Sequence, residues 1–289
     1  MYNVSVVRVG VSAVVLFLAS CATESPVTSS GALIRGRSSL DPPPAPVEDG
    51  LAVAPTHIAG ARVPGGRQVG HYDMSAQQGQ PYEVPPIVAA GGTAVNVLDP
   101  DAATLGNLNV LWVDNPENSF YDGKYVLREP EIAAAVQSGL ILVLHDRFVE
   151  DAESNLPGAT GFNIVRDFTE GADINIRDGS TLVTKDLDNT SLDNGTFSSH
   201  GFALDVSLPA RAKLILTATS NDHIVTFCYP LGRGAVIYST IPLDFYLQGF
   251  GTDPPGTDMA KVYAPNVVSY ALAGACALRA PRPTPNLNP

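Results

Sequence analysis

The feature that most constrains this fold is an uninterrupted aliphatic run, LILVL, at residues 140–144. A strand is continuously apolar only when both of its faces are covered, as in the parallel sheets of α/β proteins. A second, nearly continuous run, NVLWV, lies at residues 109–113. Between them, residues 129–139 predict a helix, with Pro130 in its first turn and Gly139 at its end. Together these segments predict a strand, a helix and a strand with a right-handed crossover.

Short apolar runs continue to the end of the chain. Four further strands are predicted, at residues 93–98, 213–218, 224–229 and 235–239. The last two flank a glycine-rich turn and should form an antiparallel hairpin. A closing helix is predicted at about 265–278, and the polar residues 146–212 predict a long irregular insertion. The expected fold is α/β: a single open, mostly parallel sheet flanked by helices, as in flavodoxin-like proteins.

The first 86 residues differ in composition from the rest of the chain. Residues 1–20 contain one cationic side chain, an apolar run and small residues, which is the profile of a signal peptide. Cys21 follows directly, in a tetrapeptide, LASC, that resembles the lipobox of bacterial lipoproteins. Cys21 is therefore predicted to carry a lipid such as palmitate, although an ordinary secretory signal is the alternative. Residues 21–86, dense in proline and glycine, predict a flexible tether in which His57 and His71 are solvated.

This organisation predicts where the chain resides and what it contacts. The domain, at residues 87–280, should stand outside the cytoplasm in the cell envelope, held at the outer membrane by its lipid. Residues 281–289 predict a disordered tail. The chain has 17 basic and 29 acidic residues and a formal net charge of -12, so it should repel a phosphate-rich partner. Nucleic acid is therefore excluded as a partner.

Two cysteines remain after Cys21, at positions 228 and 276. Both lie in apolar segments, where a free cysteine behaves as a small hydrophobic residue. Buried free thiols are therefore predicted in preference to a disulfide. The chain has no Cys-x-x-Cys pair, which argues against a structural zinc site.

Two motifs, LILVLHD at residues 140–146 and YPLGRGAVIY at residues 229–238, occur within this order of elements. The pattern resembles the class I glutamine amidotransferase-like superfamily, including its ThuA-like branch, over about residues 90–278. The resemblance implies a nucleophilic cysteine in a sharp turn after a central strand, and a histidine before a proline. Here His145 and Asp146 occupy that turn, and Ile241 precedes the proline. Glutamine hydrolysis is therefore not expected.

Polar residues follow the predicted strands at their carboxyl ends, where open α/β sheets bind ligands. They are Asp114, Asn115, His145, Asp146 and Asp244. His145 can serve as a general base or a metal ligand when a carboxylate orients it, and His200 can return to it from the insertion. The structural alternative is that His145 bonds a loop carbonyl while Asp146 caps the next turn.

An Asp- and Asn-rich segment at residues 186–195 offers the oxygen ligands that Ca²⁺ prefers. Its candidate ligands are Asp186, Asp188 and Asp193, without the spacing of an EF-hand. A solvated turn is the alternative, and no other cofactor is predicted.

Two functions fit these observations. The first is a non-catalytic, amidotransferase-like domain that binds or assembles with glycan or protein partners of the envelope. The second is a hydrolase that acts on carbohydrate through His145, Asp146 and His200. An enzyme requires these three side chains to converge in a concave pocket, whereas a binding domain does not.

Overall fold

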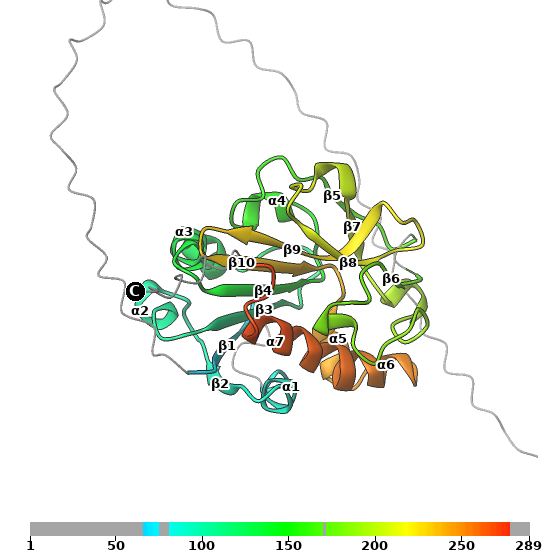
Figure 1. The fold of residues 1–289 in the computed structure, drawn as a ribbon, viewed down its shortest axis with the longest axis horizontal. Helices are drawn as coiled ribbons and strands as arrows, with labels where there is room; N and C mark the ends of the chain where they lie inside the picture. The colour runs from blue at the N-terminus through cyan, green and yellow to red at the C-terminus, as the bar shows by residue number, and fades with distance from the viewer. Residues whose placement is uncertain (1–65, 75–80, 170–171, 278–289) are drawn as a thin grey trace, which may run out of the picture. The chain divides into compact units, whose positions relative to one another are not determined.

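In the computed structural model, a ten-stranded mixed sheet with helices on both sides organises the described residues, which are 66–74, 81–169 and 172–277 (Figure 1). The predicted signal segment, Cys21 and His57 lie outside these residues, as does the predicted tail. Lipidation of Cys21 therefore stays a prediction. Within the described ranges, no helix combines the length and apolarity needed to cross a bilayer.

Five strands form the parallel half of the sheet. They are β1 (Gln68–Asp73), β2 (Thr93–Asn96), β3 (Val110–Asn115), β4 (Ile141–Asp146) and β10 (Gly234–Ser239). Their order across the sheet is β2-β1-β3-β4-β10, with parallel pairing throughout. This is the flavodoxin-like order, in which the direction of winding reverses between β1 and β3. The predicted open α/β sheet is thus confirmed.

The other half of the sheet is antiparallel. Its strands are β5 (Ile164–Arg166), β6 (Asn175–Ile176), β7 (Gly201–Leu204), β8 (Lys213–Thr217) and β9 (His223–Leu231). The predicted hairpin joins β9 to β10, and β7 and β8 both pair with β9. The segment predicted to be an irregular insertion therefore contributes short strands that extend the sheet, so the sheet is mixed overall.

Helices cover both faces of the sheet. They are α1 (Val84–Ala89), α2 (Ala102–Leu105), α3 (Gly123–Gln137), α4 (Ala152–Asn155), α5 (Leu243–Leu247), α6 (Pro255–Asp258) and α7 (Ala264–Leu272). Short 3-10 turns lie at Leu182–Thr184, Gly195–Phe197 and Asp205–Ser207, and a π-helical turn at Met259–Tyr263 leads into α7. Alternate residues of β3 face opposite ways: Leu111 packs in one core with residues of α3, whereas Trp112 packs in the other with residues of α7.

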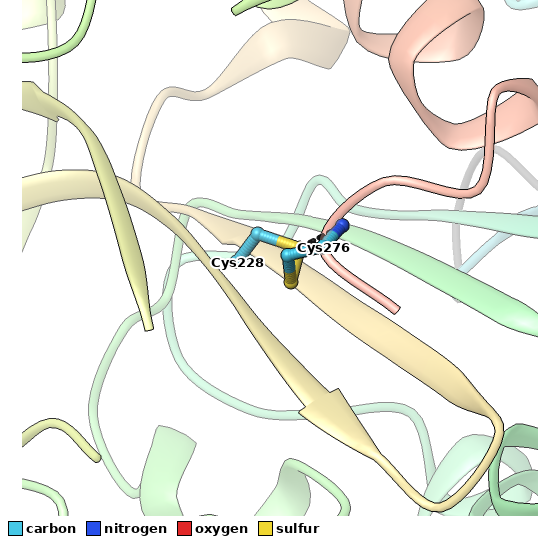
Figure 2. The surroundings of a disulfide bond; sticks show 2 residues. All are labelled: Cys228 and Cys276. Carbon is cyan, nitrogen blue, oxygen red and sulfur yellow. Dashed lines mark hydrogen bonds between the residues drawn. A yellow bond between two sulfur atoms is a disulfide. The ribbon is translucent and has the colours of Figure 1, made fainter. Parts of the chain in front are cut away.

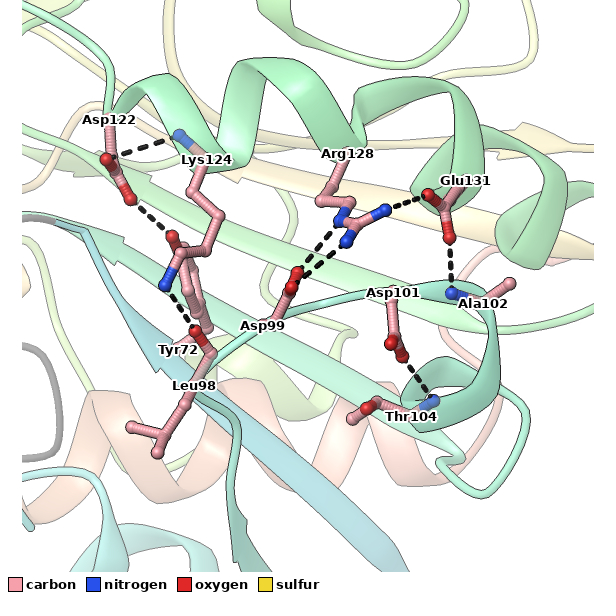
Figure 3. A network of polar contacts seen from close by, with 10 residues as sticks. All are labelled: Tyr72, Leu98, Asp99, Asp101, Ala102, Thr104, Asp122, Lys124, Arg128 and Glu131. Atoms are coloured by element: carbon pink, nitrogen blue, oxygen red, sulfur yellow. Dashed lines mark hydrogen bonds and ion pairs between the residues drawn. The ribbon is translucent and has the colours of Figure 1, made fainter.

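Helix α3 begins earlier than predicted. Its first residue is Gly123, and the Asp122 carboxylate caps it by accepting the backbone N–H of Lys124. Pro130 consequently lies inside the helix and not in its first turn. Figure 3 shows Arg128 of this helix bridging Asp99 and Glu131, which ties α3 to the loop after β2. These groups are partly exposed, so each ion pair contributes at most about 1 kcal/mol.

The predicted tether boundary at residue 86 is wrong, because β1 lies inside the sheet between β2 and β3. Its sequence, QVGHYD, lacks the continuous apolar run by which the other buried strands were predicted. A Cβ atom at Gly70 would lie 2.4 Å from Leu108 Cδ1 and 2.8 Å from Val97 Cγ2, so a larger residue there would displace these side chains. The prediction of a solvated His71 is also wrong, because its side chain is buried against its neighbours and the residue is only 3% exposed.

Cys228 and Cys276 form a disulfide, which corrects the prediction of free thiols (Figure 2). Cys228 lies on β9 and faces the core beneath α7, while Cys276 lies in the turns that follow that helix. Their Cα atoms are 6.1 Å apart, within the usual reach of a disulfide. Apolar surroundings are compatible with a buried cysteine as a free thiol or in a disulfide. The pairing therefore depends on the segment after α7, which brings Cys276 next to Cys228 on β9.

Candidate functional site

A row of buried polar side chains crosses the sheet at the carboxyl ends of the parallel strands. Asp73, Asp114, His145 and Ser239 occupy matching register positions on β1, β3, β4 and β10. Thr226 of β9 pairs with Ser239 and extends the row. Register partners on adjacent strands project from the same face, which here is the face covered by α7. We refer to these five residues as the polar row.

One end of the polar row is satisfied by hydrogen bonds. The Tyr263 hydroxyl, which enters from the π-helical turn, lies 3.2 Å from Ser239 Oγ, 3.2 Å from Thr226 Oγ1 and 3.4 Å from His145 Nε2. Thr226 and Ser239 also bond each other at 2.8 Å. Burial lowers the pKa of His145 to about 3, so its imidazole is neutral near pH 7. Tyr263, Thr226 and Ser239 thus hydrogen-bond one another and contact His145 Nε2, while His145 Nδ1 has no hydrogen-bond partner among the described residues.

At the other end of the polar row, around Asp73 and Asp114, several carboxyl groups lie close together. Glu83, which precedes α1, and Asp244 of α5 join Asp73 and Asp114, and all four are at most 3% exposed. The Arg147 guanidinium lies 2.6 Å from Asp244 Oδ2. Within the described ranges, Asp73 Oδ2, Glu83 Oε2 and Asp114 Oδ2 have no hydrogen-bond partner. Buried polar atoms are normally paired, so this end is chemically incomplete.

The carboxyl groups shift one another's pKa values. Burial, followed by the charges of Glu83, Asp73 and Asp244, raises the pKa of Asp114 well above its ordinary value. Burial and the nearby Glu83 carboxylate raise the pKa of Asp73. Burial also acts to raise the pKa of Glu83, but its interactions with His71 and Asp73 outweigh it and the net shift is downward. Burial raises the pKa of Asp244 to about 6 against the opposing charge of Arg147.

Three of these side chains have the composition of a metal site. His71 Nδ1 and one carboxylate oxygen each of Asp73 and Glu83 lie within 4.8 Å of one another. His71 and Asp73 are two positions apart on β1 and therefore face the same way. Glu83 meets them from the segment before α1, a helix whose first turn contains proline. The strand and the start of this helix thus bring one nitrogen and two oxygen ligands together.

Asn115 and Asp146, predicted at the same rim, lie on the opposite face of the sheet from His145. The Tyr121 and Tyr238 hydroxyls donate to Asp146 Oδ2, and Asn115 Nδ2 donates to Oδ1 at 3.1 Å. The Phe148 backbone N–H also donates to Asp146 Oδ1. Asp146 therefore organises the turn after β4, in agreement with the structural alternative considered from the sequence.

His200 lies beside the turn after β4 and not in the polar row. Its Nδ1 is 2.8 Å from the Arg147 carbonyl oxygen, and its ring centroid is 4.6 Å from that of Phe168. Among the contacts of the described residues, none joins His200 to His145 or Asp146. The three proposed catalytic side chains are thus near one edge but are not brought together as a unit.

The three candidate calcium ligands have separate roles. Asp188 Oδ1 accepts hydrogen bonds from Thr190, which lower the pKa of the Asp188 carboxyl. Asp193 Oδ1 accepts the Ile174 backbone N–H, and Asp186 is exposed with φ of 60°. In the described ranges, the acidic and histidine ligand atoms that converge belong to His71, Asp73 and Glu83 instead.

Three stacked phenylalanines adjoin the Arg147–Asp244 pair. The Phe245 ring lies 5.8 Å from Phe197 and 5.3 Å from Phe250, centroid to centroid. Phe197 and Phe250 are 56% and 54% exposed. The Arg147 guanidinium lies 5.9 Å from the Phe245 centroid. We call these three phenylalanines the phenylalanine strip; it offers apolar ring faces next to a charged pair.

A shallow cavity of about 600 Å³ lies away from this edge, beside the amino-terminal end of β1. Its lining residues are Gly66, Arg67, Leu182, Ser269, Leu272 and Ala273. They carry no carboxyl or imidazole group, so the described chemistry is concentrated at the carboxyl edge of the sheet.

Sequence reasoning missed His71, Asp73, Glu83 and Tyr263. The first three were assigned to the tether, because β1 alternates polar and apolar residues around a glycine. The alternation itself is a strand signal, and the prolines after Glu83 are typical of a helix start. These two signals together could have extended the domain to β1 and revealed the metal-ligating residue types.

No protein-family model and no curated protein sequence matches the chain. Solved structures with a similar arrangement include a ThuA-like protein from Parabacteroides merdae, 12% identical over 75% of this chain and 94% of that one, with a TM-score of 0.43. Another is a GMP synthase component from Thermoplasma acidophilum, 11% identical over 70% and 94% of the two chains, with a TM-score of 0.42. The assignment of an open α/β sheet rests on the strand order of the chain itself.

The predicted location in the cell envelope requires correction. A further similar structure is a cytoplasmic protein from Salmonella typhimurium, 10% identical over 70% of this chain and 98% of that one, with a TM-score of 0.47. A second cytoplasmic protein from the same organism has a TM-score of 0.43. Both are described as cytoplasmic proteins, whereas the location predicted for this chain was the outer membrane.

Proposed function

We propose that the domain binds a carbohydrate at the carboxyl edge of its sheet, without catalysing its hydrolysis. The observation that carries this proposal is the phenylalanine strip beside Arg147 and Asp244. A sugar ring presents apolar C–H faces and a rim of hydroxyl groups. Exposed aromatic rings can stack on the C–H faces of a sugar, and a guanidinium beside a carboxylate can hydrogen-bond its hydroxyl groups.

The size of the strip favours a small ligand over a protein partner. Stable protein interfaces bury about 800 Å² on each side, with roughly 20–30 residues. The exposed rings here are Phe197 and Phe250, with Phe245 half-buried between them. Charged groups immediately border the rings, so the apolar surface is narrow. These dimensions fit one or two sugar rings.

Binding is favoured over hydrolysis by the surroundings of the predicted catalytic groups. A general base works best when its pKa lies near the working pH, whereas burial lowers the pKa of His145 to about 3. Asp146 faces away from His145 and is held by tyrosine hydroxyls. His200 bonds a main-chain carbonyl instead of a second catalytic group.

The test is calorimetric titration of the folded protein with a panel of oligosaccharides. Replacing Phe250 or Phe245 with alanine should weaken binding roughly fivefold to tenfold, since each aromatic contact contributes about 1 kcal/mol. Phe120, which is 46% exposed and lies outside the strip, provides the matched control in Phe120→Ala. Failure to bind any oligosaccharide, or equal affinity in all three variants, would refute the proposal.

A further inference from the structure

We propose that His71, Asp73 and Glu83 bind a divalent transition-metal ion, with Zn²⁺ as the preferred probe. The ligand atoms lie within 4.8 Å of one another, and His71 Nδ1 is 3.3 Å from Glu83 Oε2. In a tetrahedral zinc site with bonds of about 2.0–2.1 Å, neighbouring ligand atoms are about 3.4 Å apart. Small side-chain rotations of Asp73 would complete the geometry.

The same three residues each have a buried ligand atom without a hydrogen-bond partner. These atoms are His71 Nδ1, Asp73 Oδ2 and Glu83 Oε2. Within the described ranges none of them has a hydrogen-bond partner, and His71 Nδ1 and Glu83 Oε2 meet only in an ion-pair contact of 3.3 Å. The residues are 1–3% exposed, so bulk water does not compensate them. An unpaired buried polar atom destabilises the folded protein, and a charged one does so more strongly. A single cation would satisfy all three atoms at once.

Charge balance gives a second reason. Asp73 and Glu83 are close to each other, and Asp244 acts electrostatically on both Asp73 and Asp114. The Arg147 guanidinium is already paired with Asp244. A divalent ion neutralises the two carboxylates that hold it, which removes the largest repulsion in the cluster.

The donor set indicates the class of metal. One imidazole nitrogen with two carboxylate oxygens suits Zn²⁺, Mn²⁺ or Fe²⁺ better than Ca²⁺ or Mg²⁺, which favour all-oxygen shells. Three protein ligands leave a coordination position open, as in zinc sites that also bind water or substrate. The site lies on β1, next to β3, where the winding of the sheet reverses and α/β proteins bind ligands.

The experiment measures metal binding directly and needs no carbohydrate. Chelator-treated protein is titrated with Zn²⁺ by calorimetry, and with Co²⁺ by visible absorption, which reports coordination geometry. One ion per chain is expected. Glu83→Gln keeps the side-chain size and should weaken binding on the order of 100-fold, at least as much as loss of a supporting contact. His71→Gln should have a similar effect.

The matched control is His200→Gln, because His200 is also a buried histidine but bonds a main-chain carbonyl. It should bind Zn²⁺ with the affinity of the original protein. Circular dichroism establishes that each variant is folded. Absence of stoichiometric binding by the folded original protein would overturn the proposal. Unchanged affinity in both Glu83→Gln and His71→Gln would also overturn it, because the ion would then occupy another site, such as the loop containing Asp188.

Discussion

The buried carboxyl groups on the two faces of the sheet differ in the hydrogen bonds that they accept. On the α3 face, Asp146 receives hydrogen bonds from Tyr121, Tyr238 and Asn115. On the α7 face, Asp73 and Asp114 occupy the equivalent edge, yet each has an oxygen without a partner in the described ranges. Both groups are equally buried, so burial does not distinguish them. The number of hydrogen-bond donors around each carboxyl group distinguishes them. A carboxyl group with several donors has a structural role, whereas one with an unpaired oxygen is available to a ligand.

The largest loss of stability should follow removal of the Asp146 carboxyl group, whose two oxygens both accept hydrogen bonds. Asp146→Ala leaves two buried tyrosine hydroxyls and an amide without their acceptor, so unfolding free energy should fall by about 4 kcal/mol. Urea denaturation measures this loss. A decrease below about 1 kcal/mol would mean that the two faces do not differ in the way described.

A smaller loss should follow removal of the disulfide that holds the end of α7 against β9. The bond closes a segment with a sequence separation of 48, so replacing both Cys228 and Cys276 with serine should cost about 3 kcal/mol. Hydrogen exchange should increase in α7 while α3 stays protected. A reductant should reproduce the effect in the original protein and leave the double variant unchanged; equal loosening of both helices would contradict this assignment.

His200 should contribute a pH dependence to stability. Burial lowers the pKa of His200 to about 4, against the favourable hydrogen bond to the Arg147 carbonyl. The unfolded chain therefore takes up a proton at higher pH than the folded chain, and stability is lost as pH falls from about 6.5 toward 4. Between pH 7.5 and 5 this histidine should account for about 2 kcal/mol. His200→Gln should remove that part of the pH profile, and identical profiles would contradict it.

The smallest change in stability should come from Asp114→Asn, on the face of the sheet that α7 covers. The amide keeps an oxygen that can accept the Trp112 indole N–H, and it removes one carboxyl from a repelling cluster. Stability without metal should rise by up to about 1 kcal/mol. Thermal denaturation of the chelator-treated protein measures this change. A loss similar to that of Asp146→Ala would show that Asp114 has structural donors of its own.

Local patterns predicted most of the central sheet. The runs that became β3, β4, β9 and β10 are nearly continuous in apolar character, which is typical only of strands covered on both faces. Asp114 and His145 lie at the carboxyl ends of β3 and β4, and Asp244 lies in α5, which follows β10. His145 and Asp146 point to opposite faces because consecutive side chains of a strand alternate. The groups that each of them contacts depend on which helix covers that face.

The start of the domain was not predicted, because β1 is short, polar at alternate positions and interrupted by Gly70. It is buried between β2 and β3, and β3 is separated from it in sequence by α1, β2 and α2. The helix boundary at Gly123 was missed for a related reason: Pro130 suggested a first turn, whereas Asp122 provides the actual cap.

The amino-acid sequence by itself determined the class of fold, because long apolar runs can be removed from water only inside a covered sheet. Tertiary structure alone decided that β1 lies between β2 and β3, that Cys228 meets Cys276, and that His71 and Asp73 meet Glu83. These pairings join positions separated along the chain, and their free energy depends on the order of strands and helices that surrounds them. No local pattern of residues contains that order.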